Sequence, residues 1–299
     1  MEILRALATL AESPTPEHAH LGKLLDLPGA PEPATYTEVF VFNLYPYASV
    51  YVGREGMLGG EARDRVAGFW RALGRMPPAE PDHLTALLAL YATLDDQEAA
   101  DPDPARRLLW RQSRKALLWE HLASWVFAYL DKLGEIAPPF YRSWGALLGE
   151  VLAAEVEAVG PQEILPLHLR LAPALPDPRQ DGAGEFAGAL LSPVRSGVVL
   201  TRADLARAAR DLDAGLRMGE RRFILTSLLS QDADGMLGWL AAEARRWASR
   251  HRAREGVAGE VARFWAGQAD GAAALLGDLQ PSKREGPKDV PPRNTKARC

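Results

Sequence analysis

The sequence predicts an all-α protein that folds as a single globular bundle of about nine or ten helices. Apolar residues recur at helical spacing along almost the whole chain. Prolines, glycines and capping residues divide the chain into segments of helix length. The stretch 38–62 has aromatic and β-branched runs that resemble a strand, but no other segment reads convincingly as its partner. We therefore expect an irregular, aromatic-anchored loop there.

Boundary signals define the helices of the first half. Thr15, Pro16 and Glu17 combine an N-cap residue, a proline at the first helical position and an early acid, which predicts a short helix. The later helices are expected from about 61 to 73, from 84 to 94, over roughly 104–133, and from 138 to 159. The acidic residues from 95 onward are interpreted as a loop between the second and third of these.

The second half begins with a segment rich in proline, glycine and aspartate at 172–188, which is typical of a linker. Thr201 and Asp204 then have the spacing of a capping box and open a helix. Three more helices are expected over about 219–230, 232–252 and 256–277. The predicted organisation is a helical core at 1–175, a linker or mobile loop at 176–200, C-terminal helices packing on the core at 201–278, and a disordered tail at 279–299. The tail has few apolar residues to offset its ordering entropy.

The amino-acid composition limits which kinds of partner the protein is expected to bind and in which cellular compartment it is expected to lie. The chain has 299 residues, of which 47% are hydrophobic, so a sizeable core is available. Its formal net charge of −4 gives no general reason to bind nucleic acid or anionic membrane. No run approaches the ~18–20 apolar residues that span a bilayer, so we expect no stable membrane insertion. Residues 1–14 begin with an acid and fail as a secretory signal. The single cysteine, Cys299, suits a reducing compartment, and we expect a cytoplasmic protein.

Patterns that carry catalysis or cofactor binding are not found in the sequence. The glycine run at 53–60 matches neither the dinucleotide nor the phosphate-loop pattern. The six histidines lack zinc-ligand spacing, and His18 and His20 point to different sides of a helix. No nucleophile motif is present. We therefore expect no catalytic residue, no metal and no cofactor.

Asp82 and His83 stand where an apolar helix begins. Capping alone accounts for Asp82, whose carboxylate is placed to accept from the amide near Thr85, while Pro81 fixes the entry angle. Capping does not account for Glu80, nor for a histidine at the positive end of a helix. Both a capping role and a recognition surface stay open for this segment.

Two further patterns also have two readings. His121 shares a helical stripe with Leu118, Trp125 and Tyr129, so it is either a core histidine with a hydrogen-bond partner or the base of an aromatic-lined groove. The acidic run at 95–103 is either a solvated connector or a seat for a basic segment. Arginine would pair best there, because its guanidinium is planar and bidentate.

Together these residues resemble the TorD/DmsD/NarJ family, which are cytoplasmic chaperones for molybdenum-containing oxidoreductases. The resemblance rests on "EPDHL" heading an apolar helix, an acidic break, a helix with "HLASWV", and "PYASVYVGREGMLGGEA" upstream. It covers about residues 36–133 and extends loosely to about 250. It implies a TorD-like, non-catalytic helical protein. Its implied partner is the precursor of a molybdenum oxidoreductase catalytic subunit, bound through its twin-arginine leader and held from export until molybdopterin insertion.

The resemblance also implies which residues bind the signal peptide or client. They are Tyr47, Ser49, Tyr51, Glu80, Pro81, Asp82, His83, His121 and Trp125. Leu84 joins them because the leader's apolar stretch needs a groove, for which Leu84, Leu88, Trp125 and Tyr129 are candidates. Leu87 departs from the family pattern, since many members carry an acid in that turn. Swapped dimers occur in the family, so a homodimer stays open.

Two functions of other classes also stay open. One is an all-α enzyme with an acid–histidine site around Asp82 and His83. The other is a helical regulatory or scaffold protein.

Overall fold

The structure, a computed structural model, describes residues 1–162 and 164–280. Within these residues every regular element is a helix, as predicted, and the strand-like pairing is an isolated antiparallel bridge between Tyr47 and His83. The described residues form seventeen α-helices and two π-helical segments, which exceeds the nine or ten expected. The difference arises largely because five helices have only four or five residues, too few for a periodic apolar pattern.

The elements of the first half run up to residue 159. They are α1 (Glu2–Thr9), α2 (Pro16–Leu24), α3 (Pro33–Tyr36), η1 (Thr37–Asn43), α4 (Ala48–Val52), α5 (Gly60–Ala72), α6 (Leu84–Ala100), α7 (Pro104–Ala116), η2 (Leu117–Ala123), α8 (Val126–Ile136) and α9 (Pro139–Val159). The stretch expected as an irregular loop thus contains the π-helical segment η1 and the short helix α4.

The second half adds a set of short helices and then a long hairpin. Its elements are α10 (Leu167–Arg170), α11 (Pro178–Asp181), α12 (Ala183–Leu190), α13 (Pro193–Ser196), α14 (Arg202–Asp211), α15 (Arg221–Gln231), α16 (Ala233–Ala253) and α17 (Glu255–Asp278). The three helices expected beyond residue 219 are confirmed within two residues at each end.

Helix boundaries follow the capping and proline signals. Thr15 is the N-cap of α2. The capping box of α14 forms, since the Thr201 hydroxyl accepts from the Asp204 amide at 3.3 Å and the Asp204 carboxylate accepts from the Thr201 amide at 2.8 Å. Pro139 opens α9, and Gly160 ends it with a positive φ of 82°.

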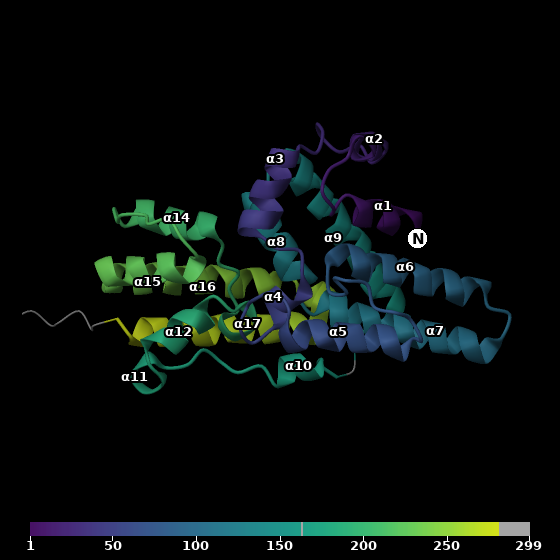
Figure 1. The fold of residues 1–299 in the computed structure, drawn as a ribbon. Helices are drawn as coiled ribbons and strands as arrows, with labels where there is room; N and C mark the ends of the chain where they lie inside the picture. Colours follow the sequence, from purple (N-terminus) through teal and green to yellow (C-terminus); the bar gives the residue numbers. More distant parts are fainter. Residues whose placement is uncertain (163, 281–299) are drawn as a thin grey trace, which may run out of the picture.

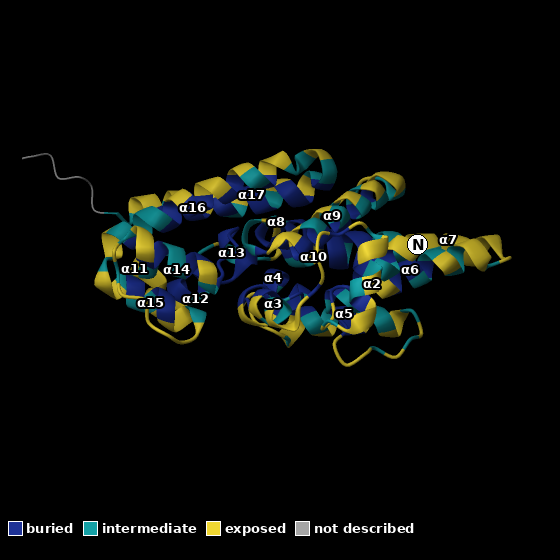
Figure 2. Cartoon of the chain, turned by 90° about the horizontal axis from the view of Figure 1, so that it is seen from above, coloured by how far each residue is buried: buried dark blue, intermediate teal, exposed yellow. Residues whose placement is uncertain are grey.

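Two helical hairpins form the frame of the molecule (Figure 1). The hairpin of α6 and α7 carries α1 on its side, and the hairpin of α16 and α17 runs along the other half. Helices α8 and α9 pack against each other, and α9 contacts both α1 and α17. One hydrophobic core extends from Leu4 to Leu276, and the buried faces of the helices turn toward it (Figure 2). The C-terminal helices therefore share a core with the N-terminal ones.

The segment 176–200, expected as a linker or mobile loop, is instead packed. It contains α11, α12 and α13, and Phe186 and Val194 are buried. Gly197 adopts a φ of +68°, and a Cβ there would lie 2.2 Å from the amide nitrogen of Ala269 in α17. The expectation was wrong because the apolar second half of this segment outweighs its polar start. The predicted disordered tail lies outside the described residues apart from residues 279 and 280.

The acidic run is mostly helical, because α6 continues to Ala100. Its carboxylates are paired with the chain's own arginines: Asp95 with Arg114, Glu98 with Arg111, Asp96 with Arg5, and Asp101 with Arg106. The prediction of a solvated loop was therefore wrong. The alternative was a binding site for an external basic segment. Arginines of the chain itself already pair with these carboxylates.

Candidate functional site

The aromatic segment and the "EPDH" segment meet as two short extended stretches. The Ala48 amide donates to the Asp82 carbonyl at 3.0 Å, and the Leu84 amide donates to the Pro46 carbonyl at 2.8 Å. These two bonds form the bridge between Tyr47 and His83. Sequence motifs separated by more than thirty residues thus form one structural unit.

Asp82 holds this unit from inside. Its side chain is buried, and one carboxylate oxygen accepts from the Ser49 amide at 3.1 Å in the first turn of α4. The Ser49 hydroxyl in turn accepts from the Gly59 amide at 3.2 Å. The cap of α6 is His83, whose Nδ1 accepts from the Thr85 amide at 3.2 Å. The prediction that Asp82 caps α6 was wrong, because its carboxylate is turned toward α4.

Only the outer edge of the unit reaches solvent. We define the motif edge as Tyr47, Glu80 and His83. The Tyr47 hydroxyl donates to the exposed Glu80 carboxylate at 2.7 Å, and its ring meets the His83 ring edge-on at 4.7 Å. Burial and the bond to Glu80 raise the pKa of Tyr47. Burial lowers the pKa of His83 although Glu80 opposes it, so His83 is neutral at pH 7 and suits a helix N-terminus.

The "HLASW" motif marks a break in a helix that was expected to run continuously over 104–133. The π-helical segment η2 ends at Ala123, and α8 begins at Val126. Two backbone carbonyls at the break accept hydrogen bonds from tryptophan side chains. The Trp125 indole donates to the His121 carbonyl at 2.7 Å, and the Trp265 indole donates to the Ser124 carbonyl at 2.9 Å. The motif therefore has a clear structural role in stabilising an interrupted helix.

The apolar groove expected beside the motif is filled. Leu84, Leu88, Trp125 and Tyr129 are each at most 1% exposed. Tyr51 is equally buried and stacks on Trp125 with ring centroids 5.0 Å apart. These side chains form the core that positions the motif edge, so they do not line an accessible groove. Pro81, Ser49 and Asp82 are buried as well.

His121 lies on the other side of the break, in a buried polar cluster that sequence reasoning missed. Its ring packs on Phe69 at 4.9 Å, and Arg65 and His168 are neighbours. Burial and the charge of Arg65 lower the pKa of His121 to about 4 and that of His168 to about 3. Neither ring nitrogen of His168 has a hydrogen-bond partner among the described residues. No spacing in the sequence marks this cluster.

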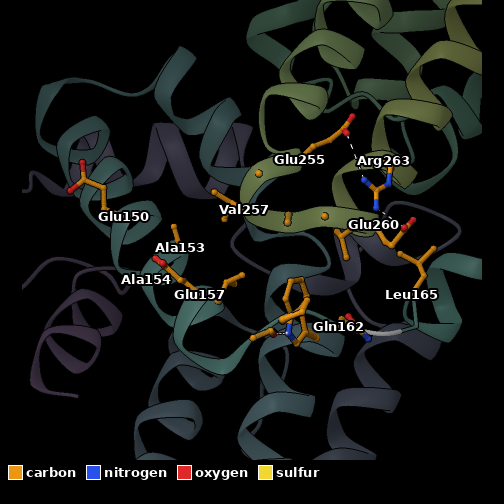
Figure 3. A pocket seen from close by; sticks show the side chains of 18 residues that line it. Glu150, Ala153, Ala154, Glu157, Gln162, Leu165, Glu255, Val257, Glu260 and Arg263 are labelled. Atoms are coloured by element: carbon orange, nitrogen blue, oxygen red, sulfur yellow. Dashed lines mark hydrogen bonds and ion pairs between the residues drawn. The ribbon is translucent and has the colours of Figure 1, made fainter.

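A cleft of about 950 Å³ opens between α9 and α17, and we call it the α9–α17 cleft (Figure 3). Glu150 and Glu157 stand on its α9 side, and Glu255, Glu260 and Arg263 stand on its α17 side. Small and apolar side chains lie between these two charged edges. The sequence gives only a weak signal for it, two glutamates seven residues apart on one helix.

Three carboxylates, of Glu135, Asp204 and Glu243, lie close enough together to suggest a cation site. They are already paired with cations of the chain. Lys132 lies 2.9 Å from Asp204, and Arg207 contacts Asp204 and Glu243 at 2.9 and 3.2 Å. We interpret the cluster as a structural charge network that joins α8, α14 and α16.

The motif edge is thus a small solvent-exposed surface on a structure whose described regular elements are all helical. Residues 30–130 match the family model described as nitrate reductase delta subunit, a range that holds all ten predicted site residues. This segment is therefore similar to the NarJ/TorD family of redox enzyme maturation chaperones, the family that the sequence motifs resemble. The family is one of chaperones, not of enzymes, and its members bind a molybdoenzyme catalytic subunit.

Searches of the curated proteins and of the solved structures found no match. Among the described residues, none of the helices combines the length and apolar character needed to cross a membrane.

Proposed function

We propose that the chain is a cytoplasmic chaperone for the precursor of a molybdopterin-dependent oxidoreductase. It binds the twin-arginine signal peptide, the immature catalytic subunit, or both, assists cofactor insertion, and delays export until insertion is complete. The observation that carries this proposal is the family match over residues 30–130. The joining of the three motifs of that segment into one packed unit supports it.

Within this proposal the ten motif residues have two kinds of role. Tyr47, Glu80 and His83 offer a carboxylate beside two rings, which suits a guanidinium of a client. The buried residues hold this motif edge in place; they are Ser49, Tyr51, Pro81, Asp82, Leu84, His121 and Trp125.

The geometry favours binding over the alternative of an acid–histidine enzyme. A general acid or base must reach a substrate proton. Asp82 is 1% exposed, and its carboxylate is bonded to the Ser49 amide. His83 uses Nδ1 to cap α6. Neither group is placed to act on a small molecule.

The test is calorimetric titration of the full chain with a synthetic leader that has two consecutive arginines followed by an apolar run. We expect saturable binding, weakened about threefold by Glu80→Gln, because one exposed charge pair contributes about 0.2–1 kcal/mol. Asp234→Asn removes an exposed carboxylate from α16 and serves as the matched control.

Co-purification from the native host, read by mass spectrometry, supplies the client. A molybdoenzyme precursor in the eluate is the expected result. If neither a leader nor a precursor binds, the proposed function is wrong.

A further inference from the structure

The glycine run at 53–60, which the proposed function does not involve, forms one wall of a pocket of about 590 Å³. We call it the α5 pocket, because the first turn of α5 lines it together with this loop and with α10. The loop is held at two points. The Gly59 amide donates to the Ser49 hydroxyl at 3.2 Å, and the Gly53 carbonyl accepts from the Ser192 hydroxyl at 3.1 Å. A pocket of this size suits a small ligand.

His168 is a buried polar side chain of this pocket that lacks a partner. The side chain is only 5% exposed, and neither ring nitrogen has a hydrogen-bond partner among the described residues. The Glu120 carboxylate lies 3.9 Å from Nδ1, too far for a hydrogen bond. Burial and Arg65 lower the pKa of His168 to about 3, so the ring is neutral and has one N–H to donate. A buried donor without an acceptor is rare in a native protein, and a ligand in the pocket would supply the acceptor.

Arg65 adds an unpaired positive charge to the same pocket. Among the described residues its guanidinium has neither a hydrogen bond nor an ion pair, and its Nε is buried. Burial lowers the pKa of Arg65 although Glu120 and Glu61 oppose this, so the charged form is poorly compensated. By contrast, the half-buried Arg114 pairs with Asp95. An anion beside Arg65 would accept charge-assisted hydrogen bonds.

The first turn of α5 supplies further donors. This helix has thirteen residues, and its N-cap is Gly59, which has no side chain to accept from the first amides. Gly59 and Gly60 have φ of 89° and 67°, in the region that favours glycine, and a Cβ on either would meet nothing within 4 Å. The glycines therefore leave the start of α5 open, and the positive end of the helix favours an anion there.

Exposed apolar side chains surround these donors. Met57 and Leu58 line the pocket from the loop, and Leu171 lines it beside α10. They are 65%, 54% and 68% exposed. Exposed apolar side chains gathered at one site are typical of a binding surface. They indicate a ligand that carries a carbon chain next to its anionic group.

The charge of the lining favours a carboxylate over a phosphate. Arg54 and Arg65 contribute two positive charges, and Glu55 and Glu61 contribute two negative ones. A phosphate ester with nearly two negative charges would face both glutamates, whereas a carboxylate carries only one. A carboxylate is also planar and can pair with a guanidinium through two parallel hydrogen bonds.

We propose that the α5 pocket binds an apolar monocarboxylate, with its carboxylate between Arg65 and His168 at the start of α5 and its carbon chain on the exposed apolar side chains. This inference goes beyond the proposed function, because the charge of the ligand is opposite to that of the twin-arginine leader. None of the motif-edge residues lines the pocket. Two sources carry such a group, a free aliphatic acid and the C-terminus of an apolar peptide.

The experiment is calorimetric titration of octanoate into the full chain, with thermal melts as a second measurement. We expect saturable binding and a melting temperature that rises with octanoate. Arg65→Met removes the charge and should weaken the Kd about tenfold. His168→Phe keeps a ring without nitrogens and should weaken it about threefold. Because Arg65 is unpaired among the described residues, Arg65→Met should not lower the melting temperature of the ligand-free chain, as loss of a purely structural arginine would.

The controls separate the pocket, the charge and the carbon chain. Arg71→Met removes an exposed arginine of α5 outside the pocket and should leave the Kd within twofold. Octanol and octylamine lack the carboxylate, and acetate and inorganic phosphate lack the chain, so each should bind more weakly than octanoate. An apolar hexapeptide is compared with its C-terminal amide. Tighter binding of the free peptide than of octanoate assigns the carboxylate to a chain end, and weaker binding assigns it to a free acid; either supports the proposal.

Three results would overturn the inference. They are no saturable binding of octanoate or of the hexapeptide, an unchanged Kd in Arg65→Met, and binding of phosphate or octylamine as tight as that of octanoate. The proposed function is tested separately, because the leader should bind Arg65→Met within twofold of wild-type. A wild-type chain that binds octanoate but neither a leader nor a precursor would contradict the proposed function and leave this inference standing.

Discussion

At the scale of the residue, Asp82 shows how a recognisable motif can have an unexpected chemical role. The sequence supported capping or recognition at this position. In the structure the side chain does cap a helix, but the helix is α4, thirty-three residues upstream, through the Ser49 amide. Which helix an aspartate caps depends on tertiary contacts, and no local pattern in the sequence contains that information.

This role gives a prediction for stability. Asp82→Ala removes the acceptor of a buried amide and should lower the free energy of unfolding by about 1–3 kcal/mol. Asp82→Asn keeps one acceptor oxygen and should cost less, as urea denaturation would show. The leader affinity of the folded Asp82→Asn chain should stay within twofold of wild-type. A large loss of affinity at unchanged stability would instead mean that Asp82 touches the client.

At the scale of the element, boundaries marked by proline, glycine and capping residues were predicted well. Thr201 with Asp204, and Pro139 with Gly160, act through neighbours in sequence, so the sequence is sufficient to place them. The break between η2 and α8 was not predicted. It is stabilised by the Trp265 indole from α17, and a contact across 141 residues leaves no trace in local periodicity.

The charge network that joins α8, α14 and α16 gives a second prediction. Lys132 is fully buried, with its ammonium 2.9 Å from the Asp204 carboxylate. Burial alone raises the pKa of Asp204, but Lys132 and Thr201 lower it below its usual value. Lys132→Met leaves buried carboxylates without this cation, and the free energy of unfolding should fall by about 3–5 kcal/mol in urea denaturation. The exposed Lys23→Met is the control, and an equal loss there would contradict the argument.

At the scale of the whole molecule, the fold class was predictable from the sequence and the α9–α17 cleft was not. Helical periodicity identifies the apolar face of each helix, but it does not say which helix covers it. The α9–α17 cleft combines residues 150–157 with 255–263, so only the assembled fold reveals it. The prediction of a groove beside Trp125 was wrong for the same reason, because the residues expected to line it are buried in the core.

Buried histidines give the whole molecule an acid-sensitive stability. The folded pKa is about 4 for His121 and about 3 for His168, below the unfolded value of about 6.5. As pH falls below about 6.5, these two histidines become protonated in the unfolded chain but stay neutral in the folded chain. The free energy of unfolding therefore decreases until about pH 4 to 3, where the folded chain also binds the protons. Thermal melts across pH 7 to 4 should show this decline.

Replacing one of these histidines isolates its contribution to the pH dependence of stability. His168→Leu should reduce the slope of the melting temperature against pH, because it removes a group that titrates only after unfolding. The exposed His20→Leu is the comparison. An unchanged slope in His168→Leu would show that this ring is protonated in the folded protein.

The bond from Trp265 to the Ser124 carbonyl has a consequence for the timing of biogenesis. The helix break beneath the family motif is completed by a side chain close to the end of the described chain. During synthesis Trp265 leaves the ribosome 141 residues after Ser124, so the break lacks this bond until most of α17 has been made.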